Sequence, residues 1–188
     1  MSQQELVKLV VEALTELGID YMMTGSVVSS LQGEPRSSHD VDLVIVMRPD
    51  AIAGMVQAFP PPNYFLSEEA IRDALQHRSM FNLLSLNDGE KVDFWILTDE
   101  PFDQSRFARK RLANMQGLEL QVSAPEDTIL MKLRWARMSG GSEKQFTDAL
   151  RVYEVQGNCL DQDYMNHWAI QLGIEDLWQR VRTEAEQV

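Results

Sequence analysis

The sequence reads YMMTGS at residues 21–26 and HDVDLVIV at residues 39–46, and these two stretches decide the expected fold. The first is a short apolar run that ends in Gly25-Ser26, and after thirteen intervening residues Asp40 and Asp42 stand on either side of one valine. Side chains alternate between the faces of a β-strand, so the two carboxylates point the same way. Their repulsion predicts a cation between them, with a divalent metal ion as the obvious candidate. A strand that shows Asp-x-Asp to solvent is the plain alternative.

A third carboxylate stands in another predicted strand. The apolar runs 80–86 and 91–97 are joined by Asn-Asp-Gly-Glu, which is typical of a β-hairpin. Asp93 interrupts the second run, and a carboxylate in an apolar strand is costly to bury unless it is paired or bound to metal. Asp93 is therefore the third acid of interest in the sequence.

Composition predicts one folded, cytoplasmic protein without a membrane span. Of 188 residues 44% are hydrophobic and 24% are charged, there is one cysteine, and neither a long apolar run nor a signal-peptide pattern is visible. The net charge of −12 argues against a broad nucleic-acid-binding surface.

The charge is unevenly distributed along the chain. Residues 1–100 carry 6 basic and 16 acidic side chains, a balance of −10, whereas residues 101–151 carry 9 and 6, a balance of +3. We expect an anionic ligand such as a triphosphate to meet this basic segment, unless the segment is a solvated helix face.

The periodicity of the chain predicts an α/β (α+β) core over residues 1–122 and a C-terminal helical region over residues 123–188 packed on it. Helices are expected at 3–17, 27–31, 49–59, 68–77, 103–115, 123–138, 142–156, 161–172 and 175–186, and strands at 19–23, 41–47, 80–86, 91–97 and 118–122. Residues 24–26 are expected to form a tight turn, and Ser123 with Glu126 has the spacing of a capping box.

These residues resemble the nucleotidyltransferase superfamily, which has the palm fold of DNA polymerase β. Its motif is a Gly-Ser turn after the first strand, Asp-x-Asp in the next strand and a third acid on a later strand. Gly25-Ser26, Asp40, Asp42 and Asp93 match it. The resemblance implies a mixed sheet flanked by helices.

The resemblance also implies a substrate, a metal cofactor and the residues that bind them. Nucleoside triphosphate would be the substrate, and two Mg²⁺ ions would be held by Asp40, Asp42 and Asp93, which are thus both metal ligands and catalytic residues. Gly25 would let the backbone approach a phosphate, and Ser26 would bind the β- and γ-phosphates at a helix N-terminus.

The C-terminal part is similar to the abortive-infection-type nucleotidyltransferases, some of which are toxins of toxin–antitoxin pairs. The similarity lies in Pro-Glu-Asp at 125–127, Leu-Met-Lys-Leu at 130–133 and Lys-Gln-Phe-Thr-Asp at 144–148. It implies that Lys132, as a catalytic and nucleotide-binding residue, and Asp148 lie near the nucleotide, and it suggests a cognate antitoxin as a partner. Arg36 precedes the acidic motif, as a basic residue does in many relatives, and is a candidate phosphate contact.

The leading hypothesis is a Mg²⁺-dependent nucleotidyltransferase that moves NMP from an NTP to a hydroxyl of tRNA, a protein or a small molecule, with a toxin–antitoxin role as one option. The alternative is a catalytically silent protein of the same fold that acts as a binding partner or antitoxin. A third option is a folded domain whose three acids are coincidental.

Overall fold

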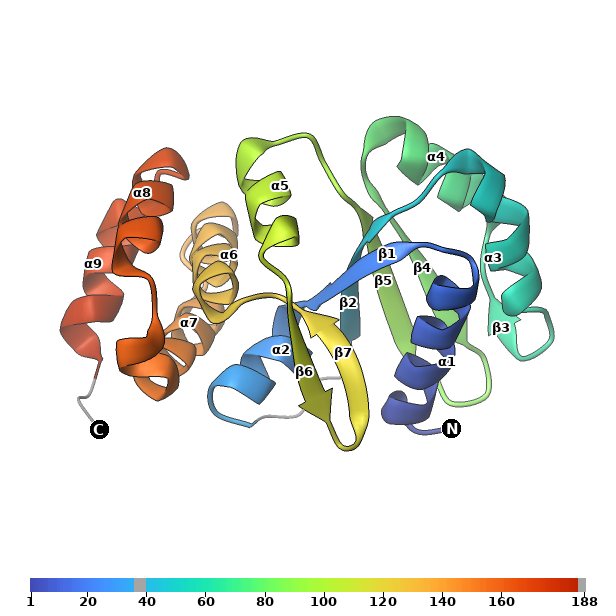
Figure 1. The fold of residues 1–188 in the computed structure, drawn as a ribbon, viewed down its shortest axis with the longest axis horizontal. Coiled ribbons are helices and arrows are strands. Elements are labelled where there is room, and N and C mark those ends of the chain that lie inside the picture. Colours follow the sequence, from blue (N-terminus) through green and yellow to red (C-terminus); the bar gives the residue numbers. More distant parts are fainter. Residues whose placement is uncertain (36–39, 186–188) are drawn as a thin grey trace. The chain divides into compact units, whose positions relative to one another are not determined.

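The computed structural model describes residues 1–35 and 40–185 of the chain (Figure 1). The chain divides into two compact units, one formed by Met1–Thr24 with Ser38–Val122 and the other by Gly25–Ser37 with Ser123–Val188. None of the described helices has the length and apolar composition of a membrane-crossing segment.

The first unit contains one mixed sheet with its helices. Its helices are α1 (Gln3–Glu16), α3 (Ile52–Ala58), α4 (Glu68–His77) and α5 (Pro101–Ala108), with a 3-10 turn at Pro49–Ala51 before α3. Its strands are β1 (Asp20–Thr24), β2 (Asp40–Val46), β3 (Tyr64–Phe65), β4 (Met80–Ser85), β5 (Lys91–Ile96), β6 (Arg111–Met115) and β7 (Leu118–Val122).

The strand order is β3-β4-β5-β2-β1-β7-β6 (Figure 1). The central strand β2 is antiparallel to β1 and parallel to β5, and β1 is parallel to β7. The predicted hairpin of β4 and β5 is present as an antiparallel pair. The two edge strands are the very short β3 and the largely exposed β6.

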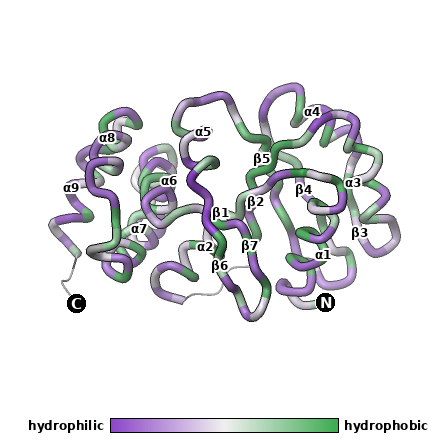
Figure 2. Tube along the Cα trace, in the orientation of Figure 1, coloured by the Kyte–Doolittle hydropathy of each residue, from purple (hydrophilic) through white to green (hydrophobic). Residues whose placement is uncertain are grey.

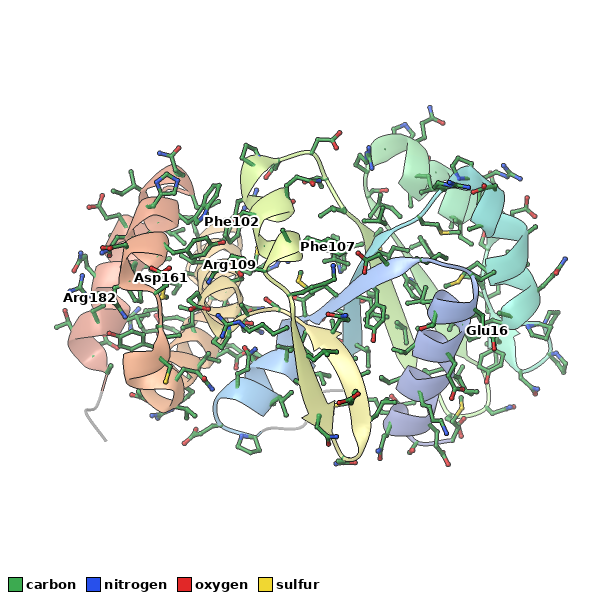
Figure 3. All side chains as sticks on the ribbon, in the orientation of Figure 1. Glu16, Phe102, Phe107, Arg109, Asp161 and Arg182 are labelled. Carbon is green, nitrogen blue, oxygen red and sulfur yellow. The ribbon has the colours of Figure 1, made fainter. Side chains whose placement is uncertain are left out.

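The core of the first unit follows from the alternation of side chains along these strands. Leu43 on β2 and Phe94 on β5 are paired in register and almost fully buried, and Phe94 stacks on Phe81 of β4 with ring centroids 4.9 Å apart. Figure 2 shows the hydrophobic residues concentrated on these central strands. On the opposite face, Phe107, labelled in Figure 3, projects from α5 and packs with Met22 and other apolar side chains.

The second unit is helical. It contains α2 (Gly25–Gln32), α6 (Pro125–Met138), α7 (Glu143–Gln156), a 3-10 turn at Gly157–Cys159, α8 (Gln162–Gln171) and α9 (Glu175–Glu184). Gly33 follows α2 where the chain passes very close to α7, and a Cβ on this residue would lie 2.9 Å from the backbone nitrogen of Val152. This close approach ties residues 25–35 to the C-terminal helices, whereas the sequence assigns them to a core over 1–122.

Three local predictions are wrong. Residues 24–26 form no separate turn, because Gly25 adopts φ 73° and begins α2 directly after β1. The predicted helix over 103–115 ends at Ala108, and its second half is the strand β6. Ser123 and Glu126 do not form a capping box. The N-cap of α6 is Ala124, Ser123 donates its hydroxyl to the carbonyl oxygen of Ala124, and Glu126 accepts the N–H of Asp161.

Candidate functional site

The three predicted acids lie on one face of two adjacent strands. In the parallel pair of β2 and β5, Asp42 is the register partner of Asp93, and Asp40 is the partner of Lys91. Residues two apart in a strand share a face, so Asp40, Asp42, Lys91 and Asp93 project from the same side of the sheet. We call Asp40, Asp42 and Asp93 the carboxylate cluster.

Strand β5 supplies a donor to each of these carboxylates. Lys91 Nζ lies 2.8 Å from Asp93 Oδ2 and 3.5 Å from Asp40 Oδ1, so one ammonium contacts two of the three acids. Trp95 Nε1 donates to Asp42 Oδ1 at 3.3 Å. The hydrogen bond to Asp93 is the main reason that the pKa of Lys91 is raised above its usual value, which keeps the ammonium charged.

Asp93 has one oxygen that these contacts do not satisfy. Its side chain is only 10% exposed, and Oδ1 is buried without a hydrogen-bond partner among the described residues. A buried carboxylate oxygen without a partner is costly, and a bound cation would remove that cost. An all-carboxylate donor set suits Mg²⁺, which binds one or two carboxylates together with substrate phosphates.

The side chains as they stand are not gathered around a metal ion. Within residues 1–35 and 40–185, no three His, Cys, Asp or Glu side chains form a group that could hold one. Instead, Lys91 contacts one oxygen of Asp40 and one oxygen of Asp93, and Trp95 contacts one oxygen of Asp42. The donor types and the buried Asp93 Oδ1 therefore fit a metal, but binding requires that these side chains reorient.

The second unit brings together three other predicted residues. Lys132 on α6 and Asp148 on α7 form a buried ion pair, with Nζ 2.7 Å from Oδ2. The same Nζ lies 3.4 Å from the hydroxyl of Ser26 on α2. Gly25, the first residue of α2, has φ 73°, a backbone conformation that favours glycine. The first N–H groups of a helix have no partner within the helix, which makes its N-terminus favourable for anions.

A small pocket of about 90 Å³ lies beside this ion pair, within the second unit. It is lined by Ser29, Glu34, Pro35, Thr147, Asp148 and Arg151. Small-molecule sites are usually about 300 Å³ or larger, so this pocket alone is smaller than a typical ligand site.

Two basic residues, Arg36 and Lys91, stand shortly before the acids in the sequence. Arg36 lies outside the described residues. Lys91 is a residue that the sequence reasoning missed as part of the site, although it stands two positions before Asp93 in the same predicted strand. The alternation rule already places these two side chains on one face.

The fold, a mixed seven-stranded sheet with helices among the described residues, is similar to the fold of solved nucleotidyltransferase structures. A nucleotidyltransferase-like protein from Paracoccidioides brasiliensis is 19% identical, with 97% of this chain and 94% of that chain covered and a TM-score of 0.55. ANT(2")-Ia in complex with adenylyl-2"-tobramycin is 12% identical, with coverages of 92% and 98% and a TM-score of 0.59. The lincosamide antibiotic adenylyltransferase LnuA is 14% identical, with coverages of 82% and 98% and a TM-score of 0.54. No protein-family model and no curated protein sequence matches the chain.

Proposed function

We propose that the protein is a Mg²⁺-dependent nucleotidyltransferase that transfers NMP from an NTP to a hydroxyl group of an acceptor and releases pyrophosphate. The observation that carries this proposal is the carboxylate cluster. Three acids from two parallel strands in register share one face, and one of them, Asp93, keeps a buried oxygen without a partner among the described residues. Folding alone does not favour such an arrangement, because the carboxylates repel one another and the buried oxygen is unsatisfied.

Each group of residues has a role in this reaction. Asp40, Asp42 and Asp93 would hold Mg²⁺, and Asp93 would also accept the proton of the attacking hydroxyl. The metal, when bound, supplies positive charge that stabilises the attacking and leaving oxygens.

In the second unit, the first N–H groups of α2 and the hydroxyl of Ser26 would bind phosphate oxygens. Lys132 contributes positive charge beside Ser26, and Asp148 holds the Lys132 ammonium in place through their 2.7 Å contact.

A small hydroxyl-bearing molecule is the acceptor that we favour over tRNA or a protein. A chain with a net charge of −12 repels a long polyanion, which disfavours RNA. Two of the structural neighbours were solved with an adenylylated antibiotic or an antibiotic, tobramycin and lincomycin, which supports an acceptor of this size. A toxin role with a cognate antitoxin would instead require a macromolecular acceptor or partner, and the same assay tests it.

One observation favours a second candidate, a catalytically silent binding protein of the same fold. Lys91 already contacts Asp40 and Asp93, and the described side chains form no ready metal site. A silent protein would bind nucleotide weakly or not at all, and its binding would not depend on the carboxylates.

The test is transfer of label from NTPs radiolabelled at the α-phosphate, with Mg²⁺ and a panel of aminoglycosides, lincosamides, tRNA and cell protein. The wild type should label at least one acceptor class, Asp42→Asn should not, and Asp73→Asn on the exposed side of α4 should match the wild type. Absence of transfer, together with NTP binding that is unchanged in Asp42→Asn, would exclude the proposed enzyme and favour the silent protein.

A further inference from the structure

Lys91 is placed where a metal ion is expected. Its ammonium lies 2.8 Å from Asp93 Oδ2 and 3.5 Å from Asp40 Oδ1, and these are two of the three proposed metal ligands. Together the three carboxylates and Lys91 carry a charge of −2, whereas the carboxylates alone would carry −3. The lysine therefore removes part of the charge that would attract a divalent cation.

The contact of Lys91 with Asp93 differs from an ordinary surface ion pair, whereas Asp40, at 63% exposed, lies largely in solvent. The side chain of Lys91 is 33% exposed and that of Asp93 is 10% exposed, whereas Lys8 and Glu12 on α1, at 61% and 54%, meet at 3.8 Å. Ion pairs that are partly removed from water are screened less by solvent and salt than exposed pairs. Solvent and salt therefore weaken the Lys91–Asp93 contact less than they weaken the exposed Lys8–Glu12 pair.

We infer that Lys91 is an internal counter-ion of the carboxylate cluster, which holds Asp40 and Asp93 before metal binds and must move away when Mg²⁺ enters. The inference rests on the proposed function, since it concerns the same carboxylates. It explains two observations together: the acids lie side by side in the sheet and Lys91 contacts two of them, yet the described side chains form no ready metal site.

The proposal predicts that the lysine weakens binding of a free metal ion. Removing its charge, as in Lys91→Met, leaves three carboxylates with no ammonium to displace. Metal-free protein titrated with MnCl₂ alone, followed by calorimetry and by electron paramagnetic resonance of free Mn²⁺, measures the difference. We expect Lys91→Met to bind Mn²⁺ about 3- to 30-fold more tightly than the wild type.

Two further variants separate charge at the site from other effects. Lys91→Arg keeps the positive charge and should bind Mn²⁺ within about 2-fold of the wild type. Lys8→Met removes the same charge from an exposed position on α1 and should also stay near the wild-type affinity. Thermal unfolding gives a second readout, because metal-free Lys91→Met should melt below the wild type and gain more from added Mn²⁺.

The outcomes are distinguishable. Equal or weaker Mn²⁺ binding by Lys91→Met overturns the inference and leaves the proposed function standing. Tighter binding by Lys8→Met to the same extent also overturns it, because the effect would then come from net charge. If none of the folded variants binds Mn²⁺, both this inference and the metal dependence of the proposed function are wrong.

Discussion

Replacing Asp148 with alanine should strongly destabilise the second unit. The side chains of Lys132 and Asp148 are 5% and 8% exposed and meet at 2.7 Å, so the substitution leaves a buried ammonium without its carboxylate. Removing one partner of a buried ion pair typically lowers the free energy of unfolding by about 3–5 kcal/mol. At roughly 2–4 °C per kcal/mol for a chain of this size, the melting temperature should fall by about 6–20 °C.

Urea unfolding followed by circular dichroism, with thermal melts, measures this loss. The double variant Lys132→Met with Asp148→Leu removes both charges and should regain stability to within about 1 kcal/mol of the wild type, because apolar pairs often replace buried ion pairs without loss. It should nevertheless fail to bind NTP if the pair serves the nucleotide. Lys8→Ala, at an exposed pair, is the control. A cost below about 1 kcal/mol for Asp148→Ala would refute the reasoning, since it would show that the charge is effectively solvated.

Three other predictions concern the carboxylates and the packing. Asp42→Asn should lower metal-dependent label transfer by at least about 100-fold while the fold is retained, and transfer at the wild-type rate would contradict its role as a metal ligand. Gly33→Ala should lower the free energy of unfolding in urea by about 1–3 kcal/mol, because the new Cβ would lie 2.9 Å from the backbone nitrogen of Val152. An unchanged unfolding midpoint would mean that the two segments separate easily. Phe94→Ala should lower the free energy of unfolding by about 3–5 kcal/mol. Phe65→Ala, at a side chain that is largely exposed, should lower it much less. Equal effects of the two substitutions would show that the Phe81–Phe94 stack is not central to the core.

The sequence was sufficient for the features that depend on local rules. The alternation of side chains predicts that Asp40 and Asp42 share a face, and the structure confirms it. The predicted hairpin over 80–97 and the helix over 68–77 are also confirmed, because turn residues and periodicity act within a few positions. The neighbouring position of Asp93 required the strand order and register, which depend on residues some fifty positions apart, and only the family resemblance suggested it.

The errors have different physical causes. Residues 111–115 lie on an edge strand that is mostly exposed, so burial imposes little apolar alternation and basic residues give the segment a helical appearance. The sequence predicts a separate turn between β1 and α2, but this link consists of the single residue Gly25 with φ 73°. Glu126 has the spacing of a capping residue, but it is buried and binds the backbone of Asp161, a tertiary contact that no local pattern predicts.

The position of α2 in the chain has a consequence for biosynthesis. This helix belongs to the second unit, where the Gln32 side chain donates to the carbonyl of Ser123 and the Gln156 side chain donates to the carbonyl of Gln32, across 91 and 124 residues. At about 5–20 residues per second, the ribosome makes α7 roughly 6–25 s after α2. During that interval Val28, which is fully buried in the folded chain, has no C-terminal helices to cover it. The second unit therefore completes its folding only after α6 and α7 have been synthesised, and a fragment that stops at Val122 would leave α2 without the helices against which it packs.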